Sequence, residues 1–179
     1  MNHSGKVALG GMVTALCVVL MFLTGVIPIA TYALPAVSGV LLVVIVIEMG
    51  AKWSWMVYAA VSVLSLLFAP DKEAAVLFVL FFGYYPILKS HIEKRQGKKA
   101  LAWVLKFLVF NAAMIASFFI AVKLLSIPED SFTLFGVYLP WVFLLLGNIV
   151  FLIYDYALSG LILMYIQKLH SSVKKMLRL

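Results

Sequence analysis

Charged residues are scarce in this chain, and their scarcity excludes an ordinary soluble fold. Asp, Glu, Lys and Arg make up 12% of the 179 residues, whereas hydrophobic residues make up 65% and the mean hydropathy is +1.14. Soluble domains are roughly half apolar and a quarter charged, so a soluble protein of this size could not bury so much apolar surface. The composition therefore predicts an integral membrane protein, and the length suits one domain covering residues 1–179.

Cysteine and histidine are also scarce, and each shortage excludes a class of site. The single cysteine, Cys17, has no partner for an internal disulfide and is expected to be a small buried residue. The three histidines fall near the termini or the expected cytoplasmic rim, so a histidine-metal cluster inside the membrane is not expected. The motifs G-x-S-x-G, H-E-x-x-H and G-x-x-x-x-G-K-[ST] do not occur. We therefore expect no enzyme, no catalytic residue, no metal and no cofactor.

What the sequence does contain is a series of long apolar segments. Six predicted spans cover residues 7–27, 34–49, 53–68, 74–92, 101–125 and 139–166. Backbone polar groups inside lipid must be satisfied within the segment, so each span is expected to be a helix. The connecting loops are too short for a soluble domain. The expected fold class is an all-α integral membrane protein, built as a single bundle of six transmembrane helices.

The distribution of basic residues orients this bundle. Of the fourteen Lys and Arg residues, only Lys72 and Lys123 fall near the predicted outer ends of spans. Loops rich in Lys and Arg stay in the cytoplasm, so we expect a multi-pass protein of the cell membrane with both termini cytoplasmic. This topology and the anionic lipid bilayer account for the net charge of +7, and no nucleic-acid partner is expected.

Three ionisable side chains fall inside the predicted spans, where charge is costly. Lys89 lies near the inner end of the fourth span, Lys106 in the inner part of the fifth and Asp155 deeper in the sixth. Long side chains can close these differences in depth, so we predict an ion pair between Asp155 and Lys106 or Lys89. Such a pair fits a structural link between helices, and it equally fits a switch that responds to a partner or substrate.

The fourth span carries a motif that predicts an irregular helix. Proline removes a backbone hydrogen bond and bends a helix, and a nearby glycine eases the bend. Pro86 follows Gly83 by three residues and precedes Lys89 by three. The motif predicts a kink that is either structural alone or a hinge placing Lys89 at a cytoplasmic partner surface.

The first span carries a stripe of small residues, Ala8, Gly11 and Ala15, spaced to lie on one helix face. Small residues let a second helix approach closely in a membrane. Packing within the same chain and docking to a partner protein both fit this stripe.

The six-span topology and the small-residue stripe resemble the substrate-binding S component of energy-coupling factor (ECF) transporters. In that family an Ala-x-x-x-Ala stripe on the first helix docks onto a membrane coupling subunit that sits on two ATPases; here the nearest such pair is Gly11 and Ala15. The resemblance implies uptake of a vitamin or similar micronutrient, bound near the outer face.

Polar and aromatic groups of the outer half are the candidate substrate contacts under this resemblance. Aromatic faces suit a flat ring, and hydroxyl and amide groups fix its orientation. For the two asparagines, hydrogen bonding between helices is the alternative role. The candidates are Tyr32, Ser62, Ser65, Asn111, Tyr138, Trp141 and Asn148.

Two other functional classes stay open. A scaffold resembling the rod-shape protein MreD would be equally apolar, would lack a substrate cavity and would act through partner helices. A self-contained channel or carrier would normally show a polar lining or an inverted repeat, and neither is evident here. A pocket facing outward under the first loop favours the S component, whereas a closed apolar interior favours the scaffold.

Overall fold

The computed structural model describes residues 3–27, 30–94, 99–125, 133–134, 137–138, 140–170 and 173, and these residues are almost entirely helical. The helices are α1 (His3–Leu23), α2 (Ala33–Met49), α3 (Ala51–Phe68), α4 (Lys72–Leu77), π-helix η2 (Phe78–Phe82), α5 (Tyr85–Lys94), α6 (Lys99–Lys123), α7 (Pro140–Met164) and π-helix η4 (Tyr165–Leu169). The all-helical fold expected from composition is confirmed. A two-residue antiparallel pair, β1 (Thr133–Leu134) and β2 (Val137–Tyr138), precedes α7 and was not expected.

Five helical segments in the described ranges are long and apolar enough to cross a membrane. They are His3–Leu23, Ala51–Phe68, Lys72–Lys94, Lys99–Lys123 and Pro140–Leu169, and the apolar α2 is shorter, at 17 residues. The chain thus has the build of a multi-pass membrane protein, while the count of six spans stays a prediction.

The first helix ends earlier than its predicted span. Its regular helix stops at Leu23, and residues 24–26 form a turn in which the Thr24 hydroxyl donates to the carbonyl of Met21. A side-chain hydroxyl that bonds the local backbone competes with the helical ladder, which favours an end at this point.

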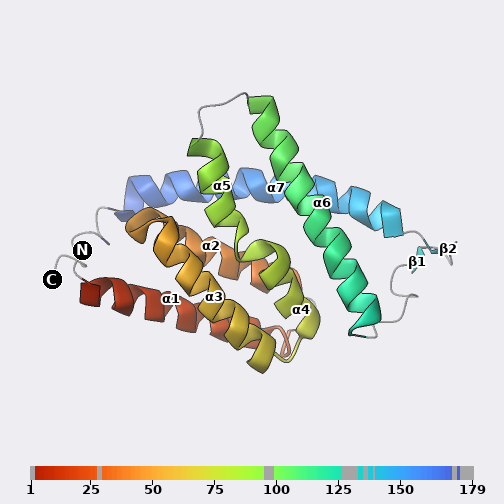
Figure 1. Ribbon diagram of the computed structural model, residues 1–179, viewed down its shortest axis with the longest axis horizontal. Coiled ribbons are helices and arrows are strands. Elements are labelled where there is room, and N and C mark those ends of the chain that lie inside the picture. Colours follow the sequence, from red (N-terminus) through yellow and green to blue (C-terminus); the bar gives the residue numbers. More distant parts are fainter. Residues whose placement is uncertain are drawn as a thin grey trace.

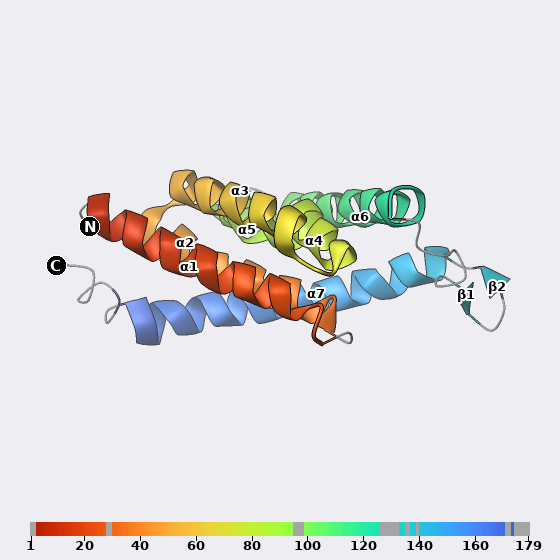
Figure 2. The same ribbon diagram turned by 90° about the horizontal axis from the view of Figure 1, so that it is seen from below.

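The segment formed by α4, η2 and α5 occupies the centre of the molecule. Half of its most apolar window is buried, whereas the other four long segments bury 22–28% of theirs. Figure 1 shows it between α3 and α6, and Figure 2 shows α3, α5 and α6 along one side of the molecule and α7 along the other. In both views α1 begins and η4 ends at the same end of the molecule.

The central segment is interrupted before Pro86, as the sequence predicts. Residues 78–82 form the π-helix η2, Gly83 and Tyr84 form a turn, and α5 then begins at Tyr85. Proline has no N–H to offer the carbonyl four residues earlier, which is that of Phe82. That carbonyl packs against Gly39 of α2, where a Cβ atom would overlap it. Helix α2 therefore approaches the break closely because residue 39 has no side chain.

Two clusters of buried residues form the interior on either side of this segment. One lies among α1, α2, α3 and α4 and contains Cys17, which is fully buried as expected. The other is rich in aromatic rings from η2, α5, α6 and α7. There Phe110 of α6 stacks on Phe151 of α7, with ring centroids 4.7 Å apart. The outward faces stay apolar, as Met12 (60% exposed) and Ile153 (65%) illustrate, and such surface suits lipid better than water.

Candidate functional site

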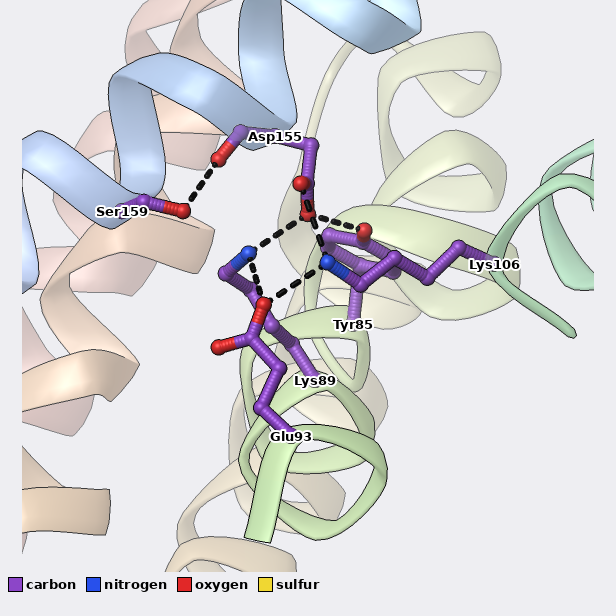
Figure 3. A network of polar contacts seen from close by, with 6 residues as sticks. All are labelled: Tyr85, Lys89, Glu93, Lys106, Asp155 and Ser159. Atoms are coloured by element: carbon purple, nitrogen blue, oxygen red, sulfur yellow. Dashed lines mark hydrogen bonds and ion pairs between the residues drawn. The ribbon is translucent and has the colours of Figure 1, made fainter. Parts of the chain in front are cut away.

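Four charged side chains and one tyrosine meet between α5, α6 and α7 (Figure 3). The Nζ atom of Lys89 lies 2.6 Å from Oε1 of Glu93 and 2.7 Å from Oδ1 of Asp155. The Nζ atom of Lys106 lies 2.7 Å from the same Glu93 oxygen and 3.0 Å from Oδ2 of Asp155. The phenol of Tyr85 donates a 2.5 Å hydrogen bond to Oδ1 of Asp155. We call the four alternating charges, Lys89, Asp155, Lys106 and Glu93, the charged ring.

Three of the four side chains in the charged ring are buried, and the fourth is exposed. The side chains of Lys89, Lys106 and Asp155 are 1%, 5% and 4% exposed, whereas that of Glu93 is 44% exposed. Burying an ion costs on the order of several kcal/mol unless it is paired and hydrogen-bonded. Two ammonium groups and two carboxylates leave the ring without net charge, so pairing offsets that cost.

Three helices bring these groups together. Tyr85, Lys89 and Glu93 are spaced four residues apart and so lie on one face of α5, while Lys106 and Asp155 come from α6 and α7. The structure thus joins the three ionisable residues singled out in the sequence, with Asp155 contacting both lysines. It also places Lys89 in the interior and not at a partner surface, so the hinge interpretation of its position is wrong.

Two members of the site, Tyr85 and Glu93, were not predicted from the sequence. The signal that could have found them is their spacing, because residues four apart on a helix that carries a buried lysine share its face.

A pocket of about 360 Å³ opens beside the charged ring. Its walls come from the end of α5, the first turns of α6 and the middle of α7. Lys106 also lies over the indole of Trp103, with Nζ 4.9 Å from the ring centroid. The pocket lining includes Glu93, Lys99, Trp103, Lys106, Asp155 and Ser159.

The two asparagines singled out as substrate candidates bind each other. Each amide nitrogen donates to the other residue's amide oxygen, at 2.8 Å from Asn111 and 3.0 Å from Asn148. Their nitrogens also donate to the carbonyls of Phe107 and Leu144, each one turn back in the same helix. This pair joins α6 to α7 and accounts for both side chains without a ligand.

The candidate contacts near the predicted outer ends fall into separate groups. The Tyr32 phenol donates to Oε1 of Glu73 at 2.9 Å, and partial burial together with the Glu73 carboxylate raises the pKa of Tyr32. Thr31 donates to Asp71 at 2.8 Å, and Asp71 also accepts from the Ala74 amide as the N-cap of α4. These contacts tie the start of α2 to the start of α4.

Several buried hydroxyls have no partner among the described residues. Ser62 and Ser65 are both buried on α3, and the Ser65 Oγ is one of the unpartnered atoms. So are Ser38 Oγ on α2 and Tyr154 Oη on α7, which sequence analysis did not single out. Buried polar atoms usually have a hydrogen-bond partner, so these hydroxyls are exceptions among the described residues.

The remaining candidates are less informative. Trp141 is 73% exposed at the start of α7, as an aromatic anchor at a membrane interface would be. Tyr138 belongs to β2, but its side chain lies outside the described part of the structure.

The small-residue stripe of α1 is not used for packing within the described chain. Ala8, Gly11 and Ala15 are all exposed, and a Cβ added at Gly11 would meet no atom within 4 Å. The neighbouring Gly10, in contrast, is buried, and its added Cβ would lie 3.4 Å from Val57. Helix α1 therefore packs inward through another face.

A second polar contact holds η4 and the residue after it to the end of α2. Oε1 of Glu48, at the end of α2, accepts from the Tyr165 phenol and lies 2.8 Å from Nδ1 of His170. Within the described ranges, no three His, Cys, Asp or Glu side chains gather in a way that would hold a metal ion. No protein-family model, curated protein or solved structure matches the chain.

Proposed function

We propose that this chain is the membrane-embedded substrate-binding subunit of an ATP-driven micronutrient transporter, similar to the S component of ECF transporters. In this proposal it crosses the membrane six times with both termini in the cytoplasm. It binds a vitamin-type molecule near the outer face and docks through α1 onto a membrane coupling subunit carried by two ATPases.

The exposed stripe on α1 is the observation that carries this proposal. Small residues in a membrane helix most often serve packing within the same chain, and here Ala8, Gly11 and Ala15 face outward instead. A face on which a second helix can approach closely is what docking to coupling helices requires.

Two further observations support the proposed topology and the outer site. Helix α1 begins and η4 ends at one end of the molecule (Figures 1 and 2), as an even number of crossings requires. Near the opposite end of α3, the unpartnered hydroxyl of Ser65 lies one turn before the helix ends. Ser38 occupies a similar place near the start of α2. Both lie close to the connections that the proposal assigns to substrate binding.

The proposal is tested by purifying the tagged chain from its native membranes in mild detergent and identifying co-purifying proteins and small molecules by mass spectrometry. We expect a membrane coupling protein and two ATPases with the unmodified chain. Gly11→Leu should reduce their recovery at least tenfold, because the bulky side chain blocks the stripe. Gly160→Leu is the matched control, since Gly160 also has open space around it but lies on α7. Absence of any ATPase with the unmodified chain contradicts the proposal.

A scaffold similar to MreD is the second candidate, and the reciprocal Asn111–Asn148 bond favours it. Two of the expected substrate contacts are thereby satisfied within the chain. Recovery of cell-wall or cytoskeletal proteins, without an ATPase or a small molecule, would establish the scaffold in place of the transporter subunit.

A further inference from the structure

The two carboxylates in the wall of the pocket beside the charged ring differ in how firmly they are held. Asp155 is held by three hydrogen bonds and is 4% exposed, whereas Glu93 uses one carboxylate oxygen and is 44% exposed. Figure 3 shows the second oxygen of Glu93 directed away from both lysines. Glu93 also lies one residue before the end of α5, where helices fray most readily. Of the two carboxylates in the ring, Glu93 is the one that can leave.

Departure of Glu93 would leave an anion site already assembled. Both lysine ammonium groups now converge on its Oε1, at 2.6 and 2.7 Å. Each ammonium has three N–H donors, and two of them are used in the ring. Lys99 lines the same pocket and is exposed, with no acceptor for its ammonium among the described residues.

We propose that Glu93 stands in for an external anion, and that Lys89, Lys99 and Lys106 form a binding site for a phosphate monoester. With Glu93 withdrawn, Lys99 and Lys106 of the pocket wall and the adjoining buried Lys89 face the single charge of Asp155, which leaves a net charge of +2. A phosphate monoester carries about −1.5 to −2 at neutral pH, so it balances this charge, whereas a carboxylate balances half of it. Trp103 supplies an apolar wall for the group that the phosphate is attached to.

Two sources can supply this chemistry, a soluble phosphate ester and the headgroup of phosphatidic acid. Basic pockets between membrane helices bind lipid headgroups, and Lys99 lies in the first turn of α6, near one end of a predicted span. The site is separate from the outer region assigned to substrate under the proposed function, and it does not depend on that assignment.

The first arm of the test measures unfolding temperature of the full chain in maltoside detergent against inorganic phosphate concentration. Glu93→Gln removes the competing charge and should lower the half-saturating phosphate concentration about tenfold. Lys99→Gln should raise it about tenfold. The matched controls are Glu73→Gln and Lys52→Gln, which change the same residue types away from the pocket. They should leave the half-saturating phosphate concentration unchanged.

The second arm uses nanodiscs of phosphatidylcholine with and without phosphatidic acid, and counts the lipids retained on the protein by native mass spectrometry. If the phosphate belongs to a lipid, retention of phosphatidic acid should rise in Glu93→Gln and fall in Lys99→Gln. If it belongs to a soluble ester, lipid retention should not change, and only the half-saturating phosphate concentration should differ between the variants. Identical behaviour of the unmodified chain and both variants in both arms overturns the proposal. If Glu93→Gln does not fold, Lys99→Gln still decides, because Lys99 is an exposed residue.

Discussion

At the residue scale, Asp155 shows how a charge is accommodated in an apolar helix. Its carboxylate accepts from Tyr85, Lys89 and Lys106, and those donors come from two other helices. A lone carboxylate at this depth would be costly, and the ring converts that cost into a contact that fixes α7 against α5 and α6. The same residue therefore sets both the local charge balance and the position of a helix.

Replacing Asp155 by Asn should strongly destabilise the protein. The variant keeps the size of the side chain but leaves two buried lysines facing Glu93 alone, and breaking a buried ion pair costs about 3–5 kcal/mol. The free energy of unfolding in mixed detergent micelles, followed by circular dichroism, measures the loss. Ser159→Ala is the control, because its hydroxyl only donates to the Asp155 carbonyl in the same helix. The double variant Asp155→Asn with Lys106→Met restores charge balance and should recover more than half of the loss.

The asparagine pair is expected to act as an interhelical contact. Asn111→Leu and Asn148→Leu should each destabilise the protein, and the double variant should lose less than the sum of the two. Hydrogen bonds between membrane helices give a coupling energy of roughly 0.6–2 kcal/mol. A double-mutant cycle on the unfolding free energy measures it. Additive losses would show that the two amides do not depend on each other, and would return them to the list of free ligand contacts.

Part of the candidate site was predictable from residue positions alone. Helices have a fixed rise per residue, so the depths of Lys106 and Asp155 indicated that their side chains could meet. Glu93 was harder to find, because it falls at the edge of its predicted span, where a carboxylate suggests solvent. The unpartnered hydroxyls of Ser38 and Ser65 were not predictable, since a lack of partners depends on how neighbouring helices pack.

At the element scale, the broken central segment depends on its neighbour α2. Pro86 fixes where the ladder loses a hydrogen bond, but the π-helix at residues 78–82 and the turn at Gly83 are the response of the packed chain. The sequence predicted that the helix is interrupted, but it did not predict the π-helix and the turn that make up the interruption. The form depends on Gly39, which lets α2 contact the freed carbonyl of Phe82.

Gly39→Ala should therefore be destabilising, against the usual preference of helices for alanine. The added methyl group would overlap a backbone oxygen, and forced overpacking costs about 1–3 kcal/mol. Gly160→Ala is the matched control, since nothing lies within 4 Å of its added Cβ, and it should be neutral or stabilising by up to about 1 kcal/mol. Thermal unfolding of both variants in the same detergent decides the comparison. Equal unfolding temperatures would mean that α2 and the break are not in tight contact.

At the scale of the whole molecule, the composition predicted the class of fold but not how the helices are arranged. Long apolar segments indicated helices and a membrane, because few other structures satisfy the backbone in lipid. Which segment lies at the centre was not predictable from apolarity, since the central Lys72–Lys94 has a mean hydropathy of only 1.5 while other long segments reach 2.0–2.2. The choice depends on matching side-chain shapes. The central place of α4, η2 and α5 also brings Lys89 into the interior, against one interpretation of the sequence.

The path of α2 decides the topology of the whole chain. At 17 residues and 1.5 Å per residue this helix is about 25 Å long, less than the roughly 30 Å thickness of the hydrocarbon core. If α2 crosses, six crossings place the start of α1 and the end of η4 on one side of the membrane. If it does not, five crossings place them on opposite sides. Its burial against α1, α3 and α5 favours crossing, because a helix packed within the bundle need not match the bilayer alone.

Cysteine labelling in intact cells tests this directly, because the one native cysteine is buried and can be replaced by alanine. Ser4→Cys, Ala33→Cys and Lys168→Cys place single thiols at exposed positions at the start of α1, the start of α2 and the end of the chain's last described helix. A membrane-impermeant maleimide should label Ala33→Cys from outside and should label the other two only after the cells are opened. Labelling of Ser4→Cys and Lys168→Cys from opposite sides would mean an odd number of crossings, and would overturn the six-span topology on which the transporter proposal rests.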